Sequence, residues 1–70
     1  MNRKLIAKRL IKLRGKRTQI ELAKAIGVSQ STYAMYETAQ RLPSDERKIA
    51  IAKFYRLTVQ DIFFNEKSHL

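Results

Sequence analysis

Residues 18–37 read as two short helices joined by a tight turn, and this stretch constrains the fold more than any other part of the chain. Apolar or small residues stand at positions 20, 22, 23 and 26. Gly27 ends that run, where a helix C-terminus favours a left-handed residue. Val28 fills the turn, and Ser29 is a good N-cap for the second helix. Ala23 supplies the small residue that two steeply crossing helices need at their contact.

The two helices are predicted to have distinct inner and outer faces. Thr18 and Glu21 form the pattern of a capping box at the start of the first helix. In the second helix, Tyr33 and Tyr36 are three residues apart and are predicted to share the buried face. The residues left for the outer face are Gln30, Ser31, Ala34 and Met35. This pattern predicts a helix-turn-helix whose second helix faces solvent.

The charge of the chain indicates a polyanionic partner. The formal net charge is +9 at pH 7 and the pI is near 10.4, which favours nucleic acid first and an anionic membrane second. The first seventeen residues hold no acid and contain the basic residues Arg3, Lys4, Lys8, Arg9, Lys12, Arg14, Lys16 and Arg17. We interpret most of these as a solvated helix face that adds long-range attraction to DNA.

The first six of these basic residues belong to a predicted helix that begins at the Asn2 cap and ends near Arg14, before Gly15. Its apolar stripe comprises Ile6, Leu10 and Leu13, widened by Leu5 and Ile11. Such a helix can lie on a membrane surface, but this one is short and the chain has no Trp, so we favour DNA. No apolar run approaches the roughly 20 residues that span a bilayer, and the pattern of a targeting segment is absent.

The link formed by Lys16 and Arg17 places two cations next to the positive end of the next helix. Two interpretations stay open. In one, a DNA phosphate there satisfies both the helix amides and the cations. In the other, the link is a mildly strained surface turn.

After residue 37 the helical pattern breaks at Pro43, and Ser44 caps a further helix with acids in its first turn. The apolar side of this helix is predicted to contain Ile49, Ile51, Ala52, Phe54 and Tyr55, with Lys48 near it. Thr58 and Asp61 resemble a shorter-armed capping box for a last helical turn. That turn holds Val59, Ile62 and Phe63, and no helical pattern continues from Phe64 onward.

Seventy residues allow one domain, which we place at residues 1–64, followed by a tail at 65–70. A chain of this length buries only about 60% of its unfolded surface. No Cys is present, so no disulfide adds stability, and dimerisation is one way to gain it. The lack of Cys is typical of a reducing cytoplasm.

These features together resemble the Cro/CI-type helix-turn-helix repressors, also called the XRE family. The resemblance covers residues 5–64, and its most specific matches are Thr18 with Gln19, Leu22 with Ala23, Ile26 to Ser29, and Tyr36 with Glu37. The resemblance is strengthened by Leu42 with Pro43 and by Asp61 to Phe64. It implies an all-α, compact five-helix, lambda-repressor-like DNA-binding domain. The family usually has Gly where Ala39 stands and often has Gly where Arg56 stands. The link between the first two helices is also about two residues shorter than the commonest form.

The resemblance implies that Gln19 binds the DNA backbone and that Gln30 and Ser31 lie where family members contact base edges. It also implies a structural ion pair between Arg14 and Glu37. With the turn and loop residues, the candidate DNA-binding set is Thr18, Gln19, Ser29, Gln30, Ser31, Ala34, Met35, Tyr36, Gln40 and Arg41.

Side-chain chemistry separates these candidates. Gln30 is the best base reader, because a glutamine amide pairs with N6 and N7 of adenine. Ser31 can bond to any base, whereas Ala34 and Met35 suit a thymine methyl group.

Each of the other assignments has an alternative. Gln19 is otherwise an ordinary polar residue, and Met35 a flexible core filler. Tyr36 is mainly a core residue whose hydroxyl can reach a phosphate. Arg41 is either a phosphate or minor-groove contact or a solvated loop charge.

One reading helix covers few bases, so proteins of this type usually bind as dimers to two half-sites about one helical turn apart. The spare apolar residues Phe63, Phe64 and Leu70 are the candidate dimer contact. The alternative is that they cover the core of the monomer.

An enzyme is not expected, because the chain has no Cys, one His at position 69 and no evident carboxylate pair or phosphate loop. No metal, cofactor or small-molecule ligand is indicated. The predicted function is sequence-specific binding of double-stranded DNA by a homodimeric, cytoplasmic and nucleoid-associated transcriptional regulator, a repressor that reads an inverted repeat through the major groove. One alternative is an antitoxin-like protein-interaction module that also binds DNA. Another is a basic nucleoid or membrane-surface protein without sequence preference.

Overall fold

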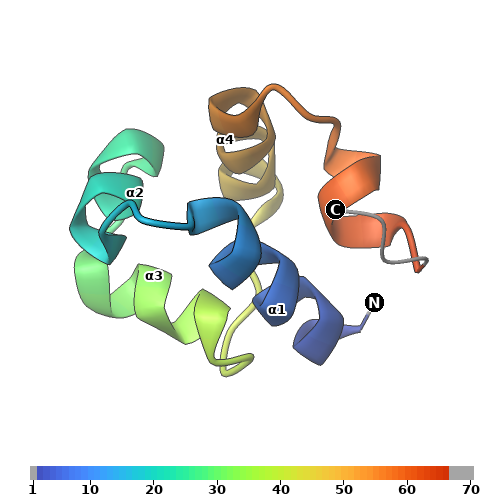
Figure 1. The fold of residues 1–70 in the computed structure, drawn as a ribbon, viewed down its shortest axis with the longest axis horizontal. Coiled ribbons are helices and arrows are strands. Elements are labelled where there is room, and N and C mark those ends of the chain that lie inside the picture. The colour runs from blue at the N-terminus through green and yellow to red at the C-terminus, as the bar shows by residue number, and fades with distance from the viewer. Residues whose placement is uncertain (1, 67–70) are drawn as a thin grey trace.

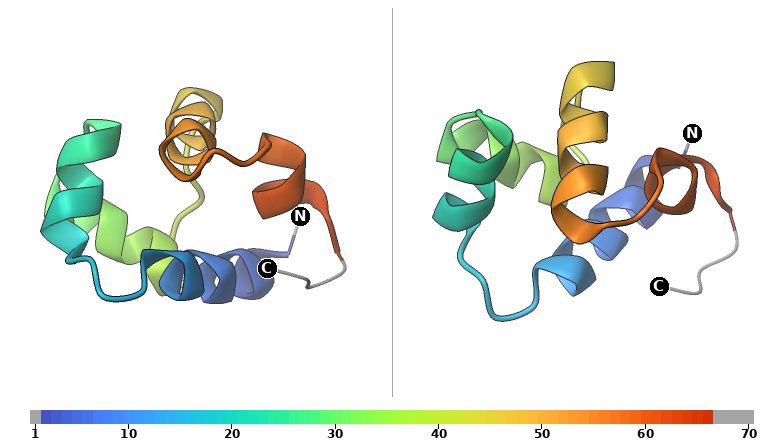
Figure 2. Two further views of the ribbon diagram at one scale, coloured as in Figure 1. Left: turned by 45° about the horizontal axis from the view of Figure 1, so that its top comes forward. Right: turned by 90° about the horizontal axis from the view of Figure 1, so that it is seen from above.

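The computed structural model describes residues 2–66 and contains five helices. In chain order they are α1 (Arg3–Arg14), α2 (Gln19–Ile26), α3 (Gln30–Glu37), α4 (Asp45–Tyr55) and the short π-helix η1 (Gln60–Phe64). Helices α2 and α3 lie together at one end of the molecule and η1 lies at the other, with α1 and α4 between them (Figure 1). Two further views show the same arrangement (Figure 2). The expected all-α, five-helix fold is confirmed.

Each α-helix begins at the side-chain cap that the sequence predicts. An oxygen of the cap residue accepts a hydrogen bond of 3.0–3.3 Å from the backbone N–H three residues later. The caps are Asn2, Thr18, Ser29 and Ser44. Gly27 ends α2 in the left-handed conformation, with φ of 76°, which a side chain would disfavour. Local chemistry therefore defines the helix boundaries around the turn.

The last helical turn is wider than predicted and includes Phe64. Both halves of its capping box are present, since Asp61 N donates to Thr58 Oγ1 over 3.0 Å and Thr58 N donates to Asp61 Oδ2 over 3.3 Å. Asn65 N bonds to Gln60 O, five residues earlier, over 2.8 Å. The expectation that helix ends before Phe64 was therefore wrong by one residue.

One core joins all five helices. It comprises Ile6, Leu10, Leu22, Ala23, Ile26, Tyr33, Tyr36, Ile51, Ala52, Ile62 and Phe63. Phe63 is 2% exposed, whereas its neighbour Phe64 is 49% exposed. Phe63 is therefore a core residue in this monomer, and its assignment to a dimer surface was wrong. Leu70 lies outside the described residues.

The apolar faces of α1 and α4 are narrower than predicted. Ile11, Ile49 and Phe54 are exposed, although the sequence analysis placed them on the apolar sides. In α4 the buried positions are 48, 51 and 52, the spacing of one helical face. The stem of Lys48 therefore takes a place at the edge of the core, with its ammonium 5.5 Å from the Phe64 ring centre.

The link between α1 and α2 is held by its own arginine. Arg17 Nη1 donates to Leu13 O over 3.3 Å, and its guanidinium carbon lies 5.4 Å from the ring centre of Phe54. Arg14 Nη1 donates to Arg17 O over 2.8 Å. Cations at a helix C-terminus meet unpaired carbonyls favourably. Of the two interpretations of this link, Arg17 thus fits the structural surface turn.

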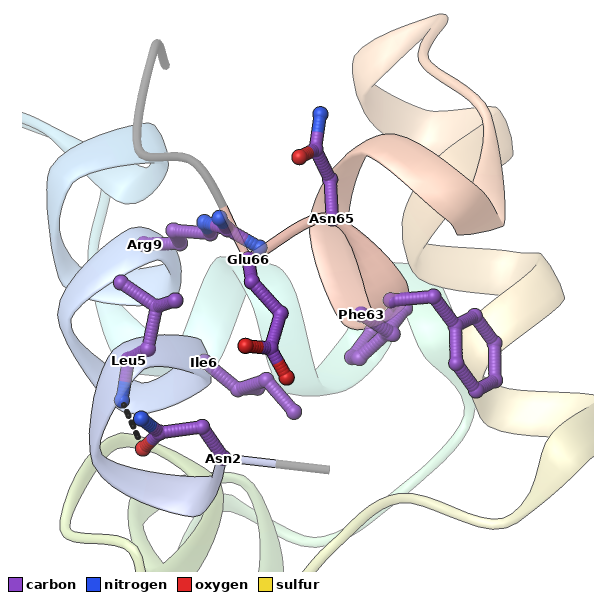
Figure 3. A pocket seen from close by; sticks show the side chains of 8 residues that line it. Asn2, Leu5, Ile6, Arg9, Phe63, Asn65 and Glu66 are labelled. Carbon is purple, nitrogen blue, oxygen red and sulfur yellow. Dashed lines mark hydrogen bonds between the residues drawn. The ribbon is translucent and has the colours of Figure 1, made fainter.

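Arg9, like Lys48, is a buried basic residue, although the sequence predicts that most basic residues of α1 are solvated. Arg9 is a core-facing residue of α1, and its Nη1 donates to Ile62 O over 2.9 Å. Beside it, a pocket of about 180 Å³ lies between α1 and η1. Figure 3 shows the side chains of the first turns of α1 facing Phe63 and the residues after η1, with Asn2 bonded to Leu5 N. Arg9 therefore joins the first helix to the last.

Candidate nucleic-acid interface

The outer face of α3 carries the residues predicted to read bases. Gln30, Ser31 and Met35 are exposed and Ala34 is half-buried, whereas Tyr33 and Tyr36 are in the core. Of the two interpretations of Met35, the structure therefore favours the surface position. The helix presents a short polar head followed by an apolar patch.

Behind this face, the carboxylate of Glu37 is fully paired. Arg14 donates to it twice, from Nε to Oε2 over 2.7 Å and from Nη2 to Oε1 over 3.0 Å. Gln19 Nε2 donates to Oε1 over 3.1 Å and the Tyr33 hydroxyl donates to Oε2 over 2.6 Å. Glu37 is 6% exposed, and each of its oxygens accepts two hydrogen bonds. The ion pair implied by the resemblance is present as part of a network that joins α1, α2 and α3.

Titration of this network follows from its contacts. Burial alone would raise the pKa of Glu37, but hydrogen bonds from Arg14, Tyr33 and Gln19 outweigh it and hold that pKa below its ordinary value. Burial and then the bond to Glu37 raise the pKa of the Tyr33 hydroxyl far above its ordinary value. The bond to Glu37 also raises the pKa of Arg14. The carboxylate thus stays ionised and the hydroxyl stays protonated near neutral pH.

The network extends to the head of α3. Gln30 Nε2 donates to Gln19 Oε1 over 3.4 Å, and Gln19 in turn donates to Glu37. A glutamine amide has two N–H donors, so Gln19 keeps one donor that Glu37 does not use. Gln30 keeps one donor and its carbonyl oxygen, the pair of groups that an adenine edge requires. Gln19 therefore bonds to Gln30 and to Glu37 and still offers one donor at the head of α2.

The hydroxyl residues at the two helix starts are also positioned by local bonds. Thr18 Oγ1 accepts from Glu21 N over 3.0 Å. Ser29 Oγ caps α3 and lies 3.2 Å from Ser31 Oγ. Their hydroxyl oxygens are thus held near the N-termini of α2 and α3, where an anion is favoured.

The loop after α3 is shaped by a left-handed residue that is not glycine. Ala39 has φ of 64°, at one of the positions where the chain departs from the family pattern. The backbone N–H groups of Gln40 and Arg41 both donate to Met35 O, over 3.0 and 3.2 Å. The side chains of Gln40 and Arg41 are exposed next to the end of α3.

A hollow lies between α3 and the start of α4, and we call it the α3–α4 notch. It has a volume of about 340 Å³ and is lined by Val28, Ser29, Thr32, Tyr36, Arg41, Ser44 and Arg47. Arg47 is not among the DNA-binding residues predicted from the sequence. A cation in the first turn of a helix opposes the peptide dipoles, and this could have drawn attention to it.

Comparison with known proteins agrees with this geometry. Residues 6–62 match the family model described as Helix-turn-helix. The chain therefore belongs to the XRE-type helix-turn-helix family of DNA-binding transcriptional regulators, whose members are typically not enzymes.

A relative supports the family assignment, and a solved structure supports the fold. The chain is 41% identical over 49 residues to the uncharacterized HTH-type transcriptional regulator MJ0272 of Methanocaldococcus jannaschii, covering 70% of this chain and 74% of that protein. The fold of this chain is similar to that of the SOS-response transcriptional repressor LexA of Eubacterium rectale, known from a solution structure. The TM-score is 0.82 and the identity 24%, over 94% of this chain and 72% of the other.

The described residues lack two kinds of feature. Among residues 2–66, no helix has the length and apolar character needed to cross a membrane. Within the same residues, His, Cys, Asp and Glu side chains form no group of three that could hold a metal ion.

Proposed function

We propose that the protein binds a specific double-stranded DNA sequence by inserting the outer face of α3 into the major groove. The observation that carries this proposal is the chain of hydrogen bonds from Gln30 through Gln19 to Glu37. It fixes an exposed amide at the head of α3 with one donor and one acceptor available. Such an amide pairs with adenine N6 and N7, worth about 1–3 kcal/mol of discrimination.

Residues around α3 supply the contacts that set its position on the duplex. Gln19 and Thr18 lie at the head of α2, and Gln40 and Arg41 follow α3. Their polar groups flank the reading helix on both sides, as phosphate contacts do when they fix register. The net charge of +9 adds a sequence-independent attraction. A protein bound in this way would be found with the nucleoid.

We further infer that the protein acts as a homodimer on an inverted repeat and represses by occupying promoter DNA. A shallow apolar groove is lined by Asp45, Lys48, Ile49, Val59 and Phe64. Ile49 and Phe64 are half exposed there, and Asp45 and Lys48 pair with each other over 3.5 Å. In a two-fold dimer the same apolar side chains of the two subunits would cover one another.

Selection from a random duplex library at about 150 mM salt tests this function. We expect two inverted half-sites with centres about one helical turn apart. Gln30→Ala should lose affinity for the selected site while keeping its affinity for scrambled duplex. Arg41→Ala is the comparison variant, because loss of a phosphate contact should weaken all duplexes alike.

Other outcomes would favour other functions. An equal loss on both duplexes for Gln30→Ala would refute base reading by this residue. Selection of a single half-site would support base reading by α3 and would exclude binding as a dimer. Retention without enrichment would indicate a basic protein without sequence preference. The apolar groove would also suit a heterologous partner, as an antitoxin-like module requires, and a stable copurifying protein in place of the dimer would favour that function.

A further inference from the structure

We propose that the α3–α4 notch is a phosphate-binding site in which Arg47, with Arg41, holds a backbone phosphate of the bound duplex. This inference rests on the proposed function and adds to it a residue of α4, outside the helix-turn-helix itself. The notch shares Ser29 and Arg41 with the predicted DNA-binding set, so it adjoins the outer face of α3. The residues that line it include two cations and no acid.

Arg47 lies against the turn between α2 and α3. Its guanidinium lies over Gly27, where an added Cβ would be 3.5 Å from Arg47 Nη1. Its own backbone N–H is used to bond Ser44 Oγ, which caps α4. The guanidinium therefore lies close to the N-terminus of the reading helix, although it belongs to a different helix.

The guanidinium is also available for a ligand. Its one ion pair is with Glu46, whose Oε1 is 3.9 Å from Arg47 Nη1 and whose side chain is 83% exposed. Such exposed pairs contribute little and are easily exchanged. The neighbouring Asp45 pairs instead with Lys48, over 3.5 Å. Within residues 2–66, no side-chain hydrogen bond holds Arg47, and its planar donors suit the oxygens of a phosphate.

Tyr36 adds a hydrogen-bond donor to the notch. This residue is 4% exposed and lines the notch, yet among the described residues its hydroxyl has no hydrogen-bond partner. The ring is buried, but the hydroxyl oxygen is accessible from the notch, so a ligand there can accept its hydrogen bond. The hydroxyls of Ser29, Thr32 and Ser44 line the same hollow. A phosphate oxygen would give the Tyr36 hydroxyl an acceptor and would offset the two arginine charges.

The test is the salt dependence of duplex binding by the full chain. Arg47→Met removes the charge and keeps a long stem, and it should weaken selected and scrambled duplexes alike, by several-fold. The slope of log K against log salt should become shallower by about 0.9, the value for one phosphate contact. Lys53→Met, which removes an exposed cation from the last turn of α4, is the matched control and should leave the slope near that of the wild type.

A second variant tests the site without changing charge. Tyr36→Phe should weaken both duplexes several-fold and leave the slope unchanged, while its thermal unfolding stays close to the wild type. An unchanged slope and affinity for Arg47→Met would overturn the proposal, as would equal losses for Arg47→Met and Lys53→Met.

Failure of the proposed function would be visible separately. If the wild type binds no duplex at all, that function fails, and titration with inorganic phosphate followed by amide NMR then decides whether the notch binds phosphate. Amide shifts at Ser29, Ser44 and Arg47 that saturate at millimolar phosphate and vanish in Arg47→Met would support the phosphate site. The ligand would then be a free phosphate ion and not a DNA phosphate. No shift would overturn it.

Discussion

The hydroxyl of Tyr33 donates to Oε2 of Glu37 across 2.6 Å, between residues four apart on α3. Tyr36 packs edge-on against Tyr33, with ring centres 6.1 Å apart, but its hydroxyl lacks such a partner among the described residues. Two tyrosines on one buried face therefore differ in the role of a single oxygen atom.

This difference predicts that replacing each tyrosine by phenylalanine changes the free energy of unfolding by different amounts. Tyr33→Phe should lower the free energy of unfolding by about 1.5–3 kcal/mol, because it removes a hydrogen bond to a charged group. Tyr36→Phe should change it by less than about 0.5 kcal/mol, because no bond within the protein is lost. Urea unfolding of both variants measures this contrast, and equal losses would contradict it.

Removal of Arg14, the cation of the Glu37 network, should lower the free energy of unfolding more than Tyr33→Phe does. Arg14→Met leaves a buried carboxylate without its charge partner, which costs about 3–5 kcal/mol when both partners are fully buried. The Arg14 side chain is 22% exposed, so we expect a loss at or below the lower end of that range. Arg3→Met, at the exposed start of α1, is the control and should have little effect. A double variant with Glu37→Gln should recover part of the loss, and additive losses would argue against coupling.

Acid should weaken the fold through Glu37. Its pKa in the folded protein lies below its ordinary value of 4.5, so the unfolded chain takes up this proton first as the pH falls. The stabilisation is complete above about pH 4.5 and is lost as the pH falls towards the folded-state pKa. Thermal melts on either side of that pH should show a steeper loss for the wild type than for Glu37→Gln. Parallel curves would mean that other carboxylates control the acid transition.

Replacing either of two left-handed residues by glycine should stabilise the protein. Ala39 and Arg56 have φ of 64° and 55°, a conformation that costs a residue with a Cβ about 1–2 kcal/mol. Glycine removes that strain but loses more entropy on folding, so each of Ala39→Gly and Arg56→Gly should stabilise by up to about 1 kcal/mol. Ala25→Gly within α2 is the control and should destabilise by about 0.5–1 kcal/mol. Lower melting temperatures for both left-handed variants would contradict this account.

The two adjacent phenylalanines should separate dimerisation from folding. Phe64→Ser changes an exposed ring and should leave monomer stability within about 1 kcal/mol, while raising the dimer dissociation constant. Phe63→Ser buries a hydroxyl in the core and should destabilise the monomer by about 3 kcal/mol or more. Sedimentation at several concentrations, with melts of each variant, checks both effects. An unchanged dimer in Phe64→Ser would remove the apolar groove from the interface.

The fold could be predicted from sequence because its boundaries depend on local contacts. Ser29 and Ser44 cap their helices through bonds within one turn, and Gly27 ends α2 through its own backbone angle. Arg9 could not be predicted in this way, because its partner Ile62 is distant in the sequence. The burial of Lys48 in place of Ile49 depends on how α4 is rotated against the core, which composition does not determine.

The candidate site divides in the same way. The outer face of α3 followed from helical spacing, since Gln30 and Ser31 lie away from Tyr33. The α3–α4 notch did not, because its walls come from the turn, α3, the following loop and α4. The whole of α3 and the following loop separate Arg47 from Gly27 in the sequence, and only the packed structure brings them together.

The bond from Arg9 to Ile62 has a consequence for the order of folding. It closes a loop of 53 residues, whereas the contacts that join α2 to α3 are local in sequence. Closing a long loop takes more chain entropy than closing a short one, and distant contacts slow a folding chain. We therefore expect η1 to dock late, onto a helix-turn-helix that has already formed, and to be the first element to detach when the protein unfolds.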